Sequence, residues 1–216
     1  MQQALGQSVT YIMACLSFVY TGAVTQVALR QDQRGQEPAP NFGEHITMKI
    51  GLMTGGTPGA DGSVSNLVAF AQDADARGFA TLWMAHIRGQ DALMLLAYAG
   101  TQTQNIELAT AVTPIQPRHP VALAQQALTA SAMSNGRFTL GIGLSHKVVI
   151  EGMYGLSFDK PAKIMREYLA VTNPLLNRKT AKHQGDMYNV HMGLDIPDAV
   201  TPVPTMIAAM GPMMLG

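Results

Sequence analysis

Residues 109–120 read ATAVTPIQPRHP, and this stretch decides the fold that the sequence predicts. It begins with small and β-branched residues typical of a buried strand, which we place at 106–112. Three prolines then fall within seven positions, which makes the following loop stiff. Proline suits the first position of a helix, so Pro120 is predicted to open a helix that runs to about residue 134. The stretch is therefore a strand–loop–helix unit.

The same alternation runs through the chain from Met48 onward. Apolar stretches predict strands, and apolar residues at helical spacing predict the helices between them. The predicted strands are 48–53, 81–85, 106–112, 138–142 and 204–209, with a further strand at 187–190 inside an insertion. Helices are predicted at 65–77, after Asp91, from Pro120, and from Asp159 and Pro161. This pattern predicts an α/β fold with a parallel sheet, either a barrel or an open doubly wound sheet.

The loops indicate where ligands would bind. Links from helix to strand are tight, whereas links from strand to helix are longer and rich in Gly, Pro, His and Ser. In both barrels and open α/β sheets, ligands bind at the carboxyl ends of parallel strands. We therefore expect the functional loops to be 54–62, 86–90, 113–119, 144–158 and 210–212.

Composition excludes several classes of function. The chain has 216 residues, of which 47% are hydrophobic and 13% charged, so it is globular, with one sizeable domain or two small ones. Its 14 basic and 14 acidic residues form no basic cluster, which argues against a nucleic-acid partner. The single cysteine, Cys15, excludes an internal disulfide framework and favours the cytoplasm. The histidines lack metal-ligand spacing, so no metal site is predicted.

The first 47 residues differ from the rest. No charge occurs before Arg30, and residues 8–29 form a mainly apolar run diluted by polar side chains. A run of about 20 apolar residues is needed to span a membrane, so an apolar anchor is one interpretation. We favour the other, in which 1–47 is an appended extension and linker, and 48–216 is the domain.

The glycine-rich loops do not match the common nucleotide motifs. The segment that begins at Gly141 starts like a dinucleotide fingerprint, but His146 stands where the third glycine belongs. The loop that begins at Gly55 lacks the Lys-Ser/Thr pair of a P-loop. No G-x-S-x-G elbow is present to indicate a hydrolase.

Taken together, four stretches resemble the luciferase-like monooxygenase superfamily, in particular its branch that uses the deazaflavin coenzyme F420. They are FATLWM (79–84), ATAVTP (109–114) with RHP (118–120), GRFTLGIG (136–143) and IAAMGP (207–212). The resemblance covers about 165 residues and implies a (β/α)₈ TIM barrel, of which the sequence supplies about the first five units. We expect the barrel to be truncated after the fifth strand.

The resemblance implies hydride transfer between coenzyme F420 and a small organic substrate. The alternatives are an FMN-dependent luciferase-like monooxygenase and a non-catalytic, truncated flavin-binding protein. The family pattern places a cis peptide bond between Ala111 and Val112, behind the cofactor ring. The implied cofactor-binding residues are Ala111, Val112, Thr113, His119, Gly141, Gly143, Ser145, Gly211 and Pro212. Histidine is suited to proton transfer near neutral pH, and the candidate catalytic residues are His86 and His146.

The predicted fifth strand has an exposed outer edge in this interpretation. Nothing after residue 209 is expected to cover it, and an uncovered edge favours association. The sequence therefore also predicts a homo-oligomer, or an unstable monomer.

Overall fold

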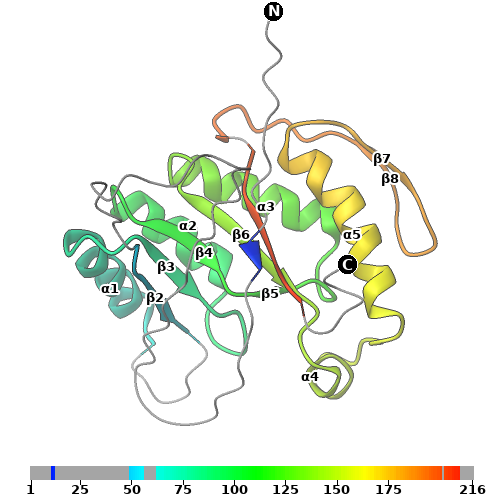
Figure 1. Cartoon of the computed structure of the whole chain (residues 1–216), viewed down its shortest axis with the longest axis horizontal. Helices are drawn as coiled ribbons and strands as arrows, with labels where there is room; N and C mark the ends of the chain where they lie inside the picture. Colours follow the sequence, from blue (N-terminus) through cyan, green and yellow to red (C-terminus); the bar gives the residue numbers. More distant parts are fainter. Residues whose placement is uncertain (1–10, 13–48, 56–61, 201, 210–216) are drawn as a thin grey trace, which may run out of the picture.

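The computed structural model describes residues 11–12, 49–55, 62–200 and 202–209. Its central feature is a parallel sheet whose main strands follow one another in chain order (Figure 1). These strands are β2 (Gly51–Thr54), β3 (Thr81–Met84), β4 (Glu107–Thr110), β6 (Phe138–Gly143) and β9 (Thr205–Ala208). The short β5 (Thr113–Pro114) follows β4 and also pairs with β6. The predicted α/β fold with a parallel sheet is confirmed.

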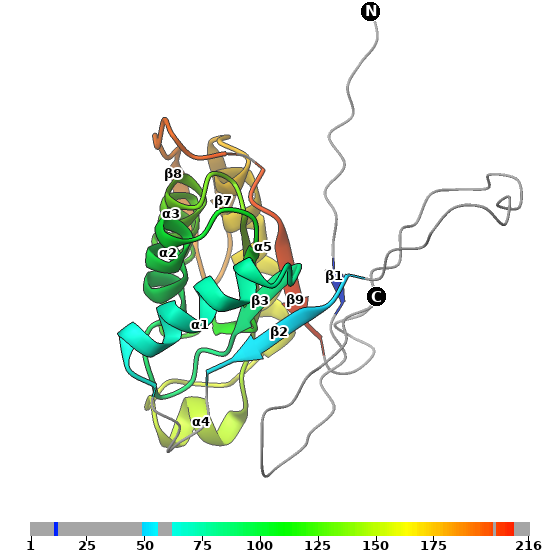
Figure 2. The ribbon, with the colours of Figure 1, turned by 90° about the vertical axis from the view of Figure 1, so that its left-hand side faces the viewer.

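Helices cover one face of the sheet, as Figure 2 shows. They are α1 (Val64–Ala76), α2 (Ala92–Gln102), α3 (Pro120–Met133) and α5 (Pro161–Leu176). Crossovers between parallel strands are right-handed almost without exception, so a strand order that never reverses keeps successive helices on one side. A doubly wound sheet needs such a reversal, and the main strands β2, β3, β4, β6 and β9 contain none. The doubly wound alternative is therefore wrong, and the sheet is an arc of consecutive barrel-type units.

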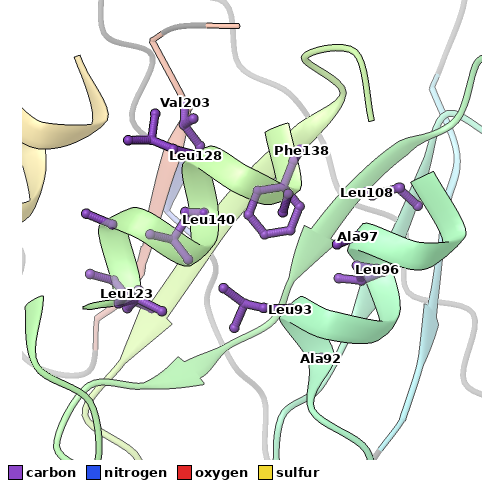
Figure 3. Close-up of a cluster of buried hydrophobic side chains, with 14 of the residues drawn as sticks. Ala92, Leu93, Leu96, Ala97, Leu108, Leu123, Leu128, Phe138, Leu140 and Val203 are labelled. Carbon is purple, nitrogen blue, oxygen red and sulfur yellow. The ribbon is translucent and has the colours of Figure 1, made fainter. Parts of the chain in front are cut away.

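The core lies between the sheet and the helices α2 and α3 (Figure 3). Leu108 on β4 and Leu140 on β6 are fully buried against this helical layer. Leu93 on α2 and Leu128 on α3 supply buried side chains from the helices. Side chains alternate along a strand, so the residues next to these leucines point to the opposite face of the sheet. We call that opposite face the concave face, because it would line the interior of a barrel.

Local signals in the sequence set the helix ends. The Asp91 side chain caps α2 by accepting hydrogen bonds from the backbone N–H groups of Leu93 (3.0 Å) and Met94 (3.1 Å). Gly78 follows α1 with a φ of +77°, which a glycine adopts at little cost. Pro120 is the first residue of α3. All three predicted helix ends are confirmed.

Asp75 and Arg137 close the end of the sheet where the strands begin. The Asp75 carboxylate accepts backbone N–H bonds from Gln104 (2.6 Å), Asn105 (3.0 Å) and Ile106 (2.8 Å), just before β4. The Arg137 guanidinium donates to the carbonyl oxygens of Ile106 (2.8 Å), Gly100 (2.8 Å) and Thr103 (2.9 Å). Burial raises the pKa of Asp75, but the three backbone hydrogen bonds outweigh it and leave the pKa lowered.

The segment after β6 departs most from the predictions. An unpredicted helix, α4 (Lys147–Gly152), occupies part of the expected loop 144–158. Helix α5 begins after Lys160, which has a φ of +49° and no side-chain cap bond, rather than at Asp159. Its Pro174 lies inside the helix. The predicted strand at 187–190 is one arm of an antiparallel hairpin formed by β7 (Ala181–Gln184) and β8 (Asn189–Met192).

The outer edge of β9 is paired, contrary to the prediction. A two-residue strand, β1 (Tyr11–Ile12), runs parallel to it, with Tyr11 opposite Met206 and Ile12 opposite Ile207. The prediction failed because it considered only residues that follow β9 in the chain. The assignment of 1–47 as an extension stays a prediction. Within the described part of the chain, every helix is too short or too polar to cross a membrane.

Candidate functional site

A cis peptide bond joins Ala111 to Val112, where the family resemblance places it. It lies between β4 and β5, which both pair with β6. Ala109 pairs with Thr139, and Thr113 pairs with Ile142. Between these two pairs the chain advances four residues on one side and only three on β6. One extra residue is therefore inserted into the strand, which defines a β-bulge at the carboxyl end of β4.

Thr110 joins the bulge to β6 from within the sheet. Its fully buried hydroxyl Oγ1 donates to the Gly141 carbonyl oxygen (2.7 Å) and accepts from the Gly141 backbone N–H (2.8 Å). Bulges disrupt the regular strand pairing, and here a side chain satisfies the two backbone groups of β6 that face the bulge. No feature of the sequence around Thr110 predicts this role.

Gly141 and Gly143 leave room for the bulge itself. A Cβ atom on Gly141 would lie 1.8 Å from the Thr110 carbonyl oxygen, and one on Gly143 would lie 2.6 Å from Val112 Cγ2. Gly141 tolerates no side chain while the bulge is in place, because the contact is with a backbone atom. At Gly143 the Val112 side chain would have to move. The bulge accounts for both glycines without a ligand, and their contact with a cofactor stays a prediction.

Small residues gather around the bulge on the concave face. Ala109 is fully buried, Ala111 is 8% exposed, and Val112 is half-buried. Trp83 and Thr139, the cross-strand neighbours of Ala109, are also half-buried. By alternation Trp83, Ala109 and Thr139 point away from the helical layer. The Val112 side chain lies on the same face, because a Cβ atom on Gly143 would meet its Cγ2 at 2.6 Å. Thr113 differs, because its register with Ile142 turns its side chain toward the helices, where Oγ1 is buried without a hydrogen-bond partner in the described structure.

His86 follows β3 and belongs to a cluster of three polar side chains. Its Nδ1 accepts a hydrogen bond from the Ala92 backbone N–H (3.1 Å), and its Nε2 lies 3.4 Å from Arg118. Arg118 forms an ion pair with Asp91 at 2.5 Å. Burial lowers the pKa of His86, the Arg118 charge lowers it further, and Asp91 opposes them. The pKa of His86 is therefore lowered, and its Nδ1 is occupied as an acceptor.

Ser145 and His146 follow β6 at the same end of the sheet. Ser145 has a φ of +58°, a backbone conformation that is uncommon for residues other than glycine. His146 is exposed and precedes α4, and its side chain makes no capping bond to that helix. His86, Ser145 and His146 are thus brought to the end of the sheet that carries the bulge.

His119 faces a different part of the molecule. Its Nδ1 accepts from the Val121 backbone N–H (3.3 Å), and its ring meets the Tyr188 ring edge-on at 5.6 Å. With Val121 and residues 189–192 of the hairpin it lines an open cavity of about 360 Å³. No local pattern predicts this contact, because Tyr188 is distant from His119 in the chain. The predicted Gly211 and Pro212 lie outside the described residues.

No group of three or more His, Cys, Asp or Glu side chains among the described residues is arranged to hold a metal ion.

Comparison with known proteins identifies the family. The family model of luciferase-like monooxygenases matches residues 46–216. The chain is 40% identical over 135 residues, 62% of its length, to a Mycobacterium tuberculosis protein that carries the name of a coenzyme F420-dependent oxidoreductase. It is 30% identical over 143 residues, 66% of its length, to the 5,10-methylenetetrahydromethanopterin reductase of Archaeoglobus fulgidus. The matches cover 38% and 42% of these two relatives, so the chain spans well under half of their length.

A solved structure shares the fold. An F420-dependent secondary alcohol dehydrogenase, in complex with an F420–acetone adduct, superimposes with a TM-score of 0.65 at 19% identity. The superposition covers 76% of this chain and 52% of that enzyme. The order of the strands, the one-sided helical layer and the family match agree. The chain belongs to the luciferase-like monooxygenase family.

Proposed function

We propose that this chain is the portion of an oxidoreductase that binds coenzyme F420 and orients it for hydride transfer with a small organic substrate. The observation that carries the proposal is the bulge at Ala111–Val112, which Thr110 joins to β6 at the carboxyl end of the strands. The names of the relatives support F420 as the cofactor. We expect the reaction to take place in the cytoplasm, on the basis of the single cysteine.

The residues present fit a flat ring system. Ala109 and Ala111 carry only methyl groups, and the half-buried Val112 offers an apolar surface at the bulge. In this arrangement the bulge supports one face of the ring, and the backbone around Ser145 contacts the rest of the cofactor. When bound, the coenzyme supplies the carbon that accepts or gives up hydride, and the protein supplies position and electrostatics.

His146 is the better of the two candidates for proton transfer. His86 is half-buried, its Nδ1 accepts from the Ala92 backbone N–H, and its Nε2 lies beside the Arg118 guanidinium, so neither ring nitrogen is free. His146 is exposed, and its side chain is not used as a helix cap. A group that exchanges protons with a substrate must be within reach of it, and the exposed ring of His146 is accessible.

Titration of the purified 216-residue chain with F420 and with FMN tests the proposal. We expect saturable binding of F420, measured by the change in its absorbance and fluorescence. Tighter binding of FMN would favour the luciferase-like monooxygenase alternative. Binding without turnover of any offered alcohol or aldehyde would favour the non-catalytic alternative, and binding of neither cofactor would refute the proposal.

The variant Ala111→Leu tests whether the cofactor ring binds at the bulge. The larger side chain would occupy the place of the ring at the bulge, so we expect cofactor binding to be lost. Ala170→Leu is the matched control, because Ala170 is exposed within α5, in the helical layer. Thermal unfolding of both variants separates loss of binding from loss of fold. Normal binding by a folded Ala111→Leu protein would contradict the proposed position of the ring.

A further inference from the structure

Three aromatic rings from separate segments of the chain meet near the start of α3. Tyr188 directly precedes β8 in the hairpin, and its ring meets the His119 ring edge-on, with 5.6 Å between the ring centres. The same ring meets that of Tyr168 on α5 edge-on at 5.8 Å. Tyr168 is fully buried, so one end of this row of rings is fixed in the core. The row connects α5, through the hairpin, to the residue that caps α3.

A buried carboxylate on α5 fixes the turn that carries Tyr188. Glu167 is 7% exposed, and its Oε2 accepts hydrogen bonds from the backbone N–H groups of Met187 (2.9 Å) and Tyr188 (3.2 Å). The bond from Met187 is the largest of the causes that hold the pKa of Glu167 below its ordinary value, so this side chain is charged at neutral pH. Gly185 lets the turn approach, because a Cβ atom there would lie against the carboxylate and 2.6 Å from His183 Nε2. The backbone of Tyr188 is therefore held by α5.

The other end of the row belongs to the loop that follows the bulge. Residues 113–119 join the bulge to α3, and His119 is the last of them. Arg118, its neighbour in the chain, pairs with Asp91 and lies 3.4 Å from His86 Nε2. A displacement of His119 would therefore change where Arg118 can reach, and with it the position of the loop at the carboxyl end of the strands.

We propose that Tyr188 is a positioning residue of the cofactor site, which fixes the loop 113–119 through the ring of His119. Glu167 holds Tyr188 in place for this contact, and Tyr168 supports it from the core. The inference rests on the proposed function, since the loop in question begins at the bulge. It gives the hairpin, which lies beside α5 (Figure 1), a part in cofactor binding.

The first measurement needs no cofactor. Tyr188→Leu removes the ring and keeps an apolar side chain, and we expect the imidazole resonances of His86 to shift in the NMR spectrum of the free protein, because Arg118 moves with His119. Tyr188→Phe keeps the ring and loses only the hydroxyl, so its His86 resonances should match those of the unaltered chain. Identical His86 resonances in all three proteins would overturn the inference while leaving the proposed function intact.

The second measurement is the dissociation constant of F420. An edge-on pair of rings is worth about 2- to 12-fold in an equilibrium constant. We therefore expect Tyr188→Leu to raise the dissociation constant by up to about tenfold, and Tyr188→Phe to leave it unchanged. Tyr98→Leu is the matched control, because Tyr98 is exposed on α2, and this variant should bind F420 normally.

The same titration separates a positioning role from a structural one. If Tyr188 only stabilised the hairpin, Tyr188→Leu would lower the urea midpoint of unfolding and leave the affinity for F420 unchanged, and that result would overturn the inference. Failure of the unaltered chain to bind F420 would instead refute the proposed function, and the inference with it.

A third variant displaces the turn without changing Tyr188. Gly185→Ala places a methyl group against the Glu167 carboxylate, so the turn must move, and we expect shifted His86 resonances and weaker F420 binding. Gly193→Ala is the matched control, because it directly follows β8 and a Cβ atom there meets only Thr180, at an ordinary 3.6 Å. Equal affinity in folded Gly185→Ala and Gly193→Ala proteins would show that the position of the turn does not matter for binding, and would overturn the inference.

Discussion

The two ends of the parallel sheet are built in different ways. Where the strands begin, Asp75 and Arg137 hold the loops with close hydrogen bonds to backbone groups. Where the strands end, the chain contains a cis peptide bond, a bulge and a serine with positive φ. The first end uses its polar groups for stability, and the second is the end at which we propose that the cofactor binds. This division is the one that barrel enzymes show between their two faces.

The largest effect is expected at the ligand end. Gly141→Ala would place a Cβ atom 1.8 Å from a backbone oxygen, which a side-chain rotation cannot relieve. We expect a loss of stability at or above the upper end of the usual 1–3 kcal/mol for overpacking, about 3 kcal/mol or more, together with loss of cofactor binding. Urea unfolding measures the first, and titration with F420 measures the second.

Gly152→Ala controls for the substitution itself. Gly152 lies in α4, and a Cβ atom there meets nothing within 4 Å. This variant should unfold at nearly the same urea concentration as the unaltered chain. A Gly141→Ala protein that is equally stable would show that the contact between the bulge and β6 is looser than the structure describes.

A smaller effect is expected at the opposite end. Asp75→Asn keeps one oxygen acceptor but loses the charge that strengthens three backbone hydrogen bonds, so we expect a loss of about 1–2 kcal/mol at pH 7. Cofactor affinity should not change, because Asp75 lies at the other end of the sheet. A large fall in affinity in a stable Asp75→Asn protein would contradict the separation of the two ends.

The pH dependence of this variant follows from the lowered pKa of Asp75. A carboxyl group with a lower pKa in the folded state stabilises the fold above its ordinary pKa of 3.8. That contribution is lost as the pH falls through the folded value. The difference in unfolding free energy between the unaltered chain and Asp75→Asn should therefore be constant down to about pH 4 and shrink below it.

The smallest effect is expected in the cluster around His86. Arg118→Gln removes a positive charge 3.4 Å from Nε2 and leaves Asp91, which favours the charged imidazole. The pKa of His86 should rise, because one of the two causes that lower it is gone, with burial as the larger cause remaining. NMR titration of the histidine resonances measures this pKa. Arg88→Gln removes the same charge from an exposed position, and this variant should leave the pKa of His86 unchanged.

Much of the fold was predictable because its signals are local. Asp91, Gly78 and Pro120 mark helix ends through bonds and backbone angles within a few residues of themselves. The alternation of apolar strands and amphipathic helices likewise depends on neighbours in the chain. The position of the cis bond was predicted by resemblance to the family, not by any local pattern in 109–114.

The candidate site was predictable only in part. The sequence and the resemblance predicted that the functional loops lie at the carboxyl ends of the strands. The structure places the bulge residues there, next to Gly141 and Gly143. They did not predict that His119 turns toward Tyr188, nor that Arg118 and Asp91 surround His86. These contacts join residues that are between 27 and 69 positions apart, and no periodicity encodes them.

The sequence by itself determined the order of strands and helices, the ends of several helices and the class of the fold, because hydrophobic spacing and capping act over one or two turns of chain. Only the tertiary structure decided why Gly141 and Gly143 are glycines, and that Tyr11–Ile12 pairs with β9. Each of these depends on how closely two distant backbones approach. The packing of the whole sheet sets that distance, so it cannot be predicted from the sequence of either segment alone.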